Sequence, residues 1–272
     1  QLCIRDRGLT DSGTTELVND TLAFLQQVDL SLPPPVIARD IHRRIRFVTG
    51  IDDPYLAAKK RNTETALELL PLVAEAVDTS LDPFVTAVKF SIAGNAIDLG
   101  AKSTRNVSVR DTFEEALLKP VDERMIRQLE WDVSRAREVL FLADNAGEIV
   151  FDRPLLEQIG ADKVTVVVRG APVINDATLA DAKRSGLMER FRVIDNGTDV
   201  PGTWLPDCSE EFAQRFHKAD VVIAKGQGNF ESLSAENRDI YFLFMTKCDS
   251  VSKKIGLAPG TYVVQKGGQC GG

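Results

Sequence analysis

The chain has 272 residues, of which 43% are hydrophobic, and it carries a formal net charge of −7. This length can bury a large core and favours two domains over one. The acidic balance argues against a nucleic-acid partner, because such proteins normally present a basic face. The sequence contains neither a membrane-length apolar run nor a signal-peptide pattern, so we expect a cytoplasmic protein without a membrane partner. Its oligomeric state stays open.

The cysteines and histidines argue against two common kinds of site. The four cysteines are scattered and do not have the spacing of a disulfide framework. Cys208 and Cys248 are interpreted as small buried residues. Because the chain has only two histidines, His42 and His217, we do not expect a zinc site built from histidines.

Residues 1–134 are predicted to form a helical domain. Apolar side chains recur at helical spacing, and Asp, Ser or Pro residues mark several of the starts. Helices are expected to begin near Asp11, after Pro35, and near Asp53, Ser80, Thr112 and Asp122.

Residues 135–272 are predicted to form an α/β domain. Short apolar runs alternate here with helical stretches, which is typical of βαβ units around a mainly parallel sheet. The predicted strands are 139–142, 164–168, 192–194, 221–224 and 262–264. The predicted helices lie near 153–159, 176–186, 209–217 and 233–246.

Acidic and amide side chains follow the first two predicted strands. Asp144 and Asn145 come after 139–142, and Asp176 comes after 164–168. Ligands of an open α/β sheet bind at the carboxyl ends of its strands, and carboxylate and amide oxygens suit Mg²⁺ or Mn²⁺. Two strand-end acids repel each other unless a cation or a proton lies between them. We therefore predict that Asp144, Asn145 and Asp176 share one divalent metal. The alternative is that Asp144 and Asn145 only cap a helix.

Two further polar residues have a functional and a structural interpretation. Glu148 lies four residues after Asp144, which is one helical turn along the same face. It either orders a metal-bound water or contacts substrate, or it is a first-turn acid favoured by the helix dipole. Asn95, in Ala-Gly-Asn-Ala, is either a polar group that the helical domain lends to the site or a C-cap partner of Gly94.

Two cations also follow predicted strands. Lys225 follows 221–224 and precedes a glycine-rich segment, 226–229, that is interpreted as a turn. An ammonium and backbone N–H groups at such a turn can bind a phosphate. Arg169 is interpreted either as a second phosphate clamp or as a solvated cation.

Several familiar catalytic patterns are missing from the sequence. The lysine segment does not have the spacing of a Walker A loop, and there is no Gly-x-Ser-x-Gly elbow or Gly-x-Gly-x-x-Gly fingerprint. Ala146 stands where a haloacid-dehalogenase-type phosphatase needs its second acid.

Four segments together resemble the signatures of the DUF89 family, which comprises metal-dependent damage-control phosphatases and their microbial relatives. The segments are 93–98, 144–148, 169–176 and 225–229. The resemblance implies an all-helical N-terminal domain on a Rossmann-like three-layer α/β/α domain. It also implies hydrolysis of small phosphorylated metabolites, such as sugar phosphates or damaged phosphometabolites.

The resemblance and the residue patterns described above together assign roles to individual residues. It implies that Asp144, Asn145 and Asp176 hold the metal, taken as Mn²⁺, Mg²⁺, Co²⁺ or Ni²⁺. The expected catalytic residues are Asp144, Glu148 and Lys225. The expected substrate-binding residues are Asn95, Arg169, Asn175, Lys225 and Asn229.

The route of the reaction and two rival functions stay open at this point. Either a metal-activated water attacks the phosphorus atom, or Asp144 attacks it as a nucleophile. An S-adenosylmethionine-dependent carboxyl methyltransferase is a second hypothesis, although the glycine-rich loop is missing after the first strand. A non-catalytic metabolite-binding protein is the third.

Overall fold

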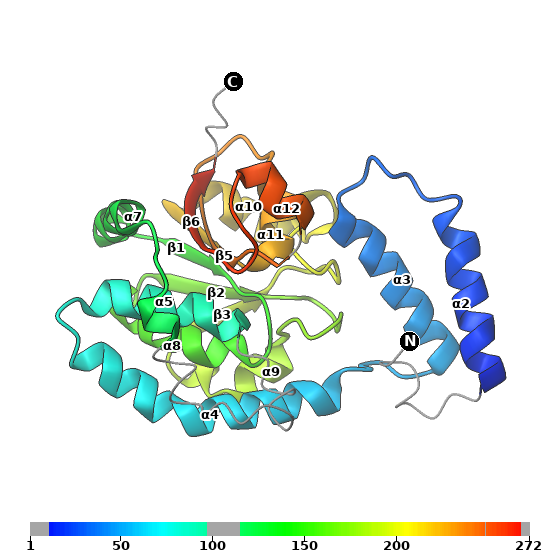
Figure 1. Cartoon of the computed structure of the whole chain (residues 1–272), viewed down its shortest axis with the longest axis horizontal. Coiled ribbons are helices and arrows are strands. Elements are labelled where there is room, and N and C mark those ends of the chain that lie inside the picture. The colour runs from blue at the N-terminus through cyan, green and yellow to red at the C-terminus, as the bar shows by residue number, and fades with distance from the viewer. Residues whose placement is uncertain (1–10, 97–114, 248, 268–272) are drawn as a thin grey trace.

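The computed structural model describes residues 11–96, 115–247 and 249–267 (Figure 1). The helices are α2 (Asp11–Leu25), α3 (Pro34–Thr49), α4 (Leu56–Asp78), α5 (Pro83–Ala96), α7 (Glu123–Arg135), α8 (Glu148–Ile159), α9 (Leu179–Arg184), α10 (Glu210–Lys218), α11 (Gly226–Leu233) and α12 (Asp249–Ile255). The strands are β1 (Val139–Leu142), β2 (Val164–Val168), β3 (Arg192–Asp195), β4 (Val221–Lys225), β5 (Ile240–Met245) and β6 (Tyr262–Gly267). Within these described ranges, no helix is both long enough and apolar enough to cross a membrane.

Some expectations fall at or beyond the edge of the described ranges. Residues 115–118 are helical, but the start of the helix expected near Thr112 lies outside the described residues. Cys3, Cys248 and Cys270 also lie outside them. Cys208 is a half-buried free thiol, and burial raises its pKa to about 12.

Local signals in the sequence set the helix ends. α3 begins with Pro34 and Pro35, whose fixed φ suits the first turn of a helix. It ends at Gly50, whose φ of 64° lies in the left-handed region that glycine adopts more readily than other residues. Asp122 caps α7 by accepting a hydrogen bond from the backbone N–H of Met125 at 3.1 Å. The expected helix starts in this part of the chain therefore lie within a few residues of the observed ones.

The six strands of the described sheet lie in the order β3-β2-β1-β4-β5-β6. All neighbouring strands are parallel except β5 and β6, which are antiparallel. This arrangement confirms the prediction of a mainly parallel, Rossmann-like sheet. The strand order reverses between β1 and β4, which makes their carboxyl ends the switch point at which open α/β sheets bind ligands.

Two hydrophobic clusters cover the two faces of the sheet. Val139 and Phe141 of β1 belong to one cluster, together with buried residues of α4, α5, α7 and α8. Leu140 and Leu142 point to the other face and belong to a cluster with α10, α11 and α12. Alternate side chains of a strand point to opposite faces, so one short strand serves both clusters. Figure 1 shows the resulting three layers, with the sheet between the two groups of helices.

The helices that precede the sheet do not all stand apart from it. Leu69 of α4, Phe90 of α5 and Ile126 of α7 share one buried cluster with Phe141 of the sheet and Phe151 of α8. In Figure 1, α2 and α3 lie beside this body. The division of the chain at residues 134 and 135 therefore stays a prediction.

A hydrogen bond and ion pairs join α3 to the loops that follow β2 and β3. Arg43 and Arg46 place their Nη2 atoms 2.5 Å and 2.6 Å from the two carboxylate oxygens of Asp199. Arg46 also donates through Nη1 to the carbonyl oxygen of Pro172 at 2.5 Å. Burial favours the neutral form of Asp199, but the hydrogen bonds from both arginines outweigh it and lower the pKa of this carboxyl group. α3 therefore borders the carboxyl edge of the sheet.

One predicted helix is wrong. The segment 233–246 was expected to be helical, but residues 240–245 form strand β5 between β4 and β6. The run Ile-Tyr-Phe-Leu-Phe-Met is apolar at every position, and such a run fits a buried helix and a buried strand equally well. Pairing on both sides decides for the strand.

The glycine-rich segment after Lys225 was also interpreted incorrectly. Residues 226–229 were expected to form a turn, but they are the first turn of α11. Gly226 has a φ of +80°, a conformation that L side chains rarely adopt, and it allows the chain to pass at once from strand to helix. Lys225 at the end of β4 and Asn229 in the first turn of α11 are thereby placed together at the switch point.

Candidate active site

Three charged side chains lie at the carboxyl ends of neighbouring strands. Asp144 lies two residues beyond β1, Arg169 follows β2 directly, and Lys225 is the last residue of β4. Because β1 pairs in parallel with both β2 and β4, these ends share one edge of the sheet. The structure thus brings together the strand-end residues that the sequence singled out.

The segment after β1 pairs with the segment that carries Asp176. Asn145 and Asp176 form an isolated antiparallel bridge. The N–H of Ala146 donates to the carbonyl oxygen of Asn175 at 2.9 Å, and the N–H of Ala177 donates to that of Asp144 at 2.7 Å. These backbone bonds hold Asp144, Asn145 and Asp176 side by side, as a shared metal site requires.

Arg169 lies between the two aspartates. Its Nε donates to Asp176 Oδ2 at 2.8 Å, and its Nη2 lies 4.0 Å from Asp144 Oδ1. Only 1% of the residue is exposed, which rules out the alternative of a solvated cation. Among the described residues, Nη1 of Arg169 has no hydrogen-bond partner. A buried guanidinium N–H without a partner is costly, so this atom is poised to receive an anionic ligand.

Burial and mutual repulsion act on the acids of the site. Burial raises the pKa of Asp144 to about 8, and repulsion from Glu148 and Asp176 adds to this effect, whereas Arg169 and Lys247 oppose it. Burial also raises the pKa of Asp176, against the favourable charge and hydrogen bond of Arg169. The ionised forms of Asp144 and Asp176 are therefore unfavourable in these surroundings when no cation is bound.

Glu148 and Asn145 are joined directly. The Nδ2 atom of Asn145 donates to Glu148 Oε2 at 3.0 Å and to Asp144 Oδ2 at 2.9 Å. Glu148 is the first residue of α8 and is 2% exposed. Such burial exceeds what a dipole-favoured surface acid needs, so Glu148 belongs to the acidic cluster itself.

Lys225 is fully buried and all three of its N–H donors are used. Its Nζ donates to the carbonyl oxygen of Ser91 at 2.8 Å, to Glu148 Oε1 at 2.7 Å and to Asp152 Oδ1 at 2.5 Å. The two carboxylates outweigh the effect of burial and raise the pKa of Lys225. Lys225 therefore holds Glu148 in this structure, and its contact with a phosphate stays a prediction.

Asn229 binds the strand ends to one another. Its Nδ2 donates to the carbonyl oxygens of Lys225 at 2.7 Å and Ala143 at 3.2 Å. Its Oδ1 accepts hydrogen bonds from Thr203 Oγ1 at 2.8 Å and Arg169 Nη2 at 3.4 Å. The structure places this side chain beneath the site as a brace, and direct contact with a substrate stays a prediction.

Two predicted substrate-binding asparagines are less well defined. Asn175 is half-buried and contributes its carbonyl oxygen to the pairing described above. It follows Ile174, whose φ of 44° is unusual for a β-branched residue and marks local backbone strain beside Asp176. Asn95 lies in α5, but its side chain falls outside the described residues. Its neighbour Gly94 packs against Phe151 of α8, where a Cβ would lie 3.0 Å from the ring.

Asp152 and Ser91 also belong to the site, although their sequence positions did not predict it. Asp152 is completely buried in α8, and its Oδ1 accepts hydrogen bonds from Lys225 and from Ser91 Oγ at 2.6 Å. Asp152 lies four residues after Glu148, and therefore one turn along the same buried face of α8. That spacing was the available signal for Asp152, whereas an ordinary serine in apolar α5 gave none.

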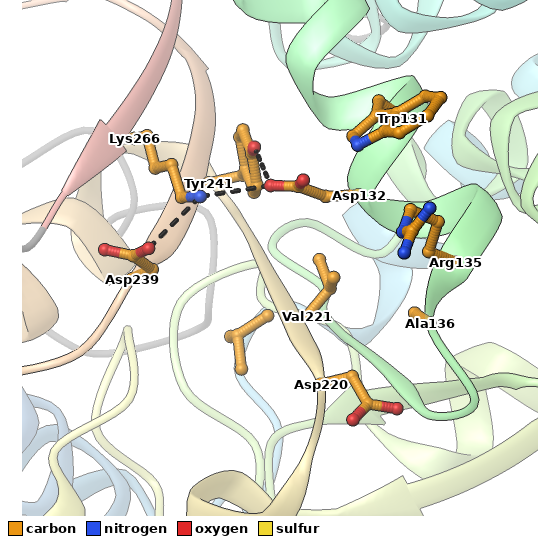
Figure 2. Close-up of a pocket in the computed structure, with 10 residues that line it drawn as sticks. Trp131, Asp132, Arg135, Ala136, Asp220, Val221, Asp239, Tyr241 and Lys266 are labelled. Atoms are coloured by element: carbon orange, nitrogen blue, oxygen red, sulfur yellow. Dashed lines mark hydrogen bonds and ion pairs between the residues drawn. The ribbon is translucent and has the colours of Figure 1, made fainter.

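A separate hollow of about 330 Å³ lies near the starts of β4 and β5, at the opposite edge of the sheet (Figure 2). Tyr241 Oη donates to Asp132 Oδ2 at 2.5 Å, and Lys266 Nζ lies 3.0 Å and 3.1 Å from Asp132 and Asp239. Figure 2 shows these contacts on one side of the hollow and Trp131 with Arg135 on the other. They join α7 to β5 and β6, at a distance from the candidate site.

The sequence and the fold of this chain are similar to those of known proteins. A family model described as a damage-control phosphatase ARMT1-like domain matches residues 7–263. An uncharacterized protein of Methanocaldococcus jannaschii is 36% identical over 92% of this chain and 86% of its own length. A damage-control phosphatase of Archaeoglobus fulgidus is 35% identical over 92% of this chain and 89% of its own. The crystal structure of a DUF89 family protein from Pyrococcus horikoshii has a TM-score of 0.86 and 31% identity, with coverage of 97% and 93%.

Proposed function

Because the chain belongs to the family of damage-control phosphatase ARMT1-like domains, the DUF89 family, we propose that it is a divalent-metal-dependent phosphatase of small phosphorylated metabolites. One observation carries the proposal. Asp144, Asp176 and the unpartnered Nη1 of Arg169 converge at the switch point, within the described residues. A metal-dependent phosphatase requires acids that bind the cation and a nearby donor that binds the phosphate. The two aspartates and Arg169 match these two requirements.

The residues of the site fit a hard divalent cation. Asp144 and Asp176 supply carboxylate oxygens, and Asn145 supplies an amide oxygen without adding charge. In the described part of the chain, no three His, Cys, Asp or Glu side chains form a metal-binding group by themselves. The proposed site therefore depends on the amide oxygen of Asn145 as a ligand.

The charge balance of the cluster supports a cation as well. Four buried acids, Asp144, Glu148, Asp152 and Asp176, face the buried cations Arg169 and Lys225. A further buried cation nearby, Lys59, is paired with other acids, Asp53 and Asp181. If all six are ionised, the four acids exceed the two cations by two negative charges. A single divalent ion would balance this excess among the six groups.

Each remaining residue then has a chemical role. When bound, the metal would polarise the phosphoryl group and lower the pKa of a bound water. Arg169 donates through Nη1 to a phosphoryl oxygen and stabilises the charge that develops there. Glu148 orients the attacking water, whose oxygen forms the new P–O bond as the ester P–O bond breaks. One proton of this water passes to the leaving oxygen, and the other stays on the released phosphate.

Phosphate release from a defined panel of compounds tests the proposal. The protein is stripped with a chelator and assayed on sugar phosphates, nucleotides and phosphopantetheine compounds, with Mn²⁺, Mg²⁺, Co²⁺ or Ni²⁺ restored one at a time. We expect turnover only with a metal, its loss in Asp144→Ala, and its retention in Asp132→Asn at the opposite edge of the sheet.

Three other outcomes would contradict the proposal. Full activity of Asp144→Ala would remove the site from the reaction. Metal binding without turnover on the whole panel would favour a metabolite-binding protein. Tight metal-independent binding of S-adenosylmethionine would favour the methyltransferase.

A further inference from the structure

A chain of buried polar contacts runs from α5 to the proposed metal ligands. Ser91 Oγ donates to Asp152, and Lys225 donates to both Asp152 and Glu148. Glu148 accepts a hydrogen bond from Asn145 at 3.0 Å. The contacts therefore pass through α5, α8, the end of β4 and the segment after β1, and every link joins two different parts of the fold.

Each member of this chain limits the freedom of the next. Lys225 uses its three donors on Ser91, Asp152 and Glu148, so it cannot turn toward the solvent without breaking buried ion pairs. Glu148 is held through Oε1 by Lys225 and through Oε2 by Asn145. A buried network in which each member is held fixes one arrangement of side chains.

The last link sets the orientation of the Asn145 amide. Its Nδ2 is held by the carboxylates of Asp144 and Glu148. The two ends of an amide point apart, so holding the nitrogen leaves Oδ1 as the end that can bind a cation. Glu148 and Asp144 together thus set which atom of Asn145 is offered to the metal.

Asp152 stands at the origin of this arrangement. It is 0% exposed, and in the described part of the chain its Oδ2 has no hydrogen-bond partner. A buried carboxylate with an unused oxygen costs stability, and Lys225 offsets that cost only while the two buried charges stay paired. The contacts of Asp152 hold Lys225 and Ser91 in place.

We propose that Asp152 and Lys225 are positioning residues of the metal site: Asp152 holds Lys225, Lys225 holds Glu148, and Glu148 turns the oxygen of Asn145 toward the cation. The inference rests on the proposed function, because it assumes the metal. It gives Lys225 a task other than contact with phosphate. It also gives Asp152 a role in holding Lys225, although Asp152 is fully buried and does not reach a substrate.

Mn²⁺ binding and turnover in Asp152→Asn test this inference. The change keeps the shape of the side chain but removes its charge. We expect calorimetric Mn²⁺ affinity to fall about 10–100-fold, as is typical when a group behind a metal ligand is altered. We expect kcat to fall at saturating Mn²⁺ while KM for the phosphate ester changes little, because no substrate contact is lost. Asp132→Asn, whose carboxylate also pairs with a lysine, is the control and should match the wild type in both measurements.

Ser91→Ala is the second variant if Asp152→Asn does not fold. It removes one hydrogen bond to Asp152 but keeps the carbonyl oxygen that binds Lys225. It should weaken Mn²⁺ binding in the same direction by a smaller factor.

The outcomes separate this inference from the proposed function. Wild-type Mn²⁺ affinity and kcat in a folded Asp152→Asn protein would overturn the positioning role and leave the phosphatase intact. A wild-type protein that neither binds Mn²⁺ nor releases phosphate would overturn both.

Discussion

The Cα atom of Gly226 lies so close to the Asp144 carboxylate that a Cβ at position 226 would overlap its oxygens. The backbone at Gly226 also has a φ of +80°. The start of α11 therefore packs against the Asp144 carboxylate so closely that only glycine fits at position 226. Any side chain at this position must displace either the helix or the carboxylate.

Gly226→Ala is expected to lose activity and stability together. The positive φ alone costs about 1–2 kcal/mol for a non-glycine residue, and displacement of Asp144 adds to that. We expect phosphate release to fall to background and the melting temperature to drop. Gly256→Ala is the matched control, since Gly256 has a φ of +70° and open space around its Cα. It should reproduce the backbone strain but keep full activity, and equal activities in the two variants would contradict the fit.

Replacement of Asp144 by Asn should stabilise the metal-free protein at high pH. The pKa of Asp144 rises from an ordinary 3.8 to about 8 on folding, so the native state holds its proton more tightly than the unfolded state does. The free energy of unfolding of the wild type should therefore fall as pH rises from about 4 to about 8. Asp144→Asn lacks this titration and should melt several degrees higher at pH 8, at about 2–4 °C per kcal/mol for a chain of this size.

Melting curves in a chelator at pH 5 and pH 8 check this expectation. The advantage of Asp144→Asn should be small at pH 5 and larger at pH 8. Added Mn²⁺ should reverse the order, because only the wild type gains stability from binding. A wild type that melts above Asp144→Asn at pH 8 in the chelator would contradict the assignment of a strained, cation-free carboxylate.

Arg169→Lys is expected to lower kcat/KM while the protein stays folded. Lysine keeps the positive charge beside Asp176 but cannot also supply the free guanidinium N–H. Loss of one such donor typically costs about a hundredfold or more in rate. Arg184→Lys is the control, because Arg184 forms a comparable 2.8 Å ion pair with buried Asp181, which is not one of the proposed ligands. Unchanged kcat/KM in Arg169→Lys would remove the phosphate clamp from the proposal.

The sequence predicts most of this fold because its signals are local. Proline, aspartate and glycine mark the ends of α3 and α7, and β1 and β2 coincide with their predicted ranges. β5 was missed because an entirely apolar run does not reveal its periodicity, and its identity depends on pairing with β4 and β6. Pairing of that kind joins residues distant in sequence, which a local pattern does not contain.

The site, too, has residues that the sequence predicts and contacts that only the structure shows. Asp144, Asn145 and Arg169 follow strands, and the rule that parallel strand ends share an edge is enough to bring them together. The partners of Lys225 are different, because Ser91 comes from α5, far earlier in the chain. The charge and position of Lys225 indicate an anion-binding role, and only the structure shows that buried protein carboxylates satisfy it.

Calorimetric titration of the chelator-stripped protein with Mn²⁺ tests most directly whether Asp144 and Asp176 share one cation. We predict one high-affinity ion per chain in the wild type, and loss of that binding in Asp144→Ala and equally in Asp176→Ala. Asp132→Asn should bind as the wild type does. Wild-type stoichiometry and affinity in both aspartate variants would contradict the shared site.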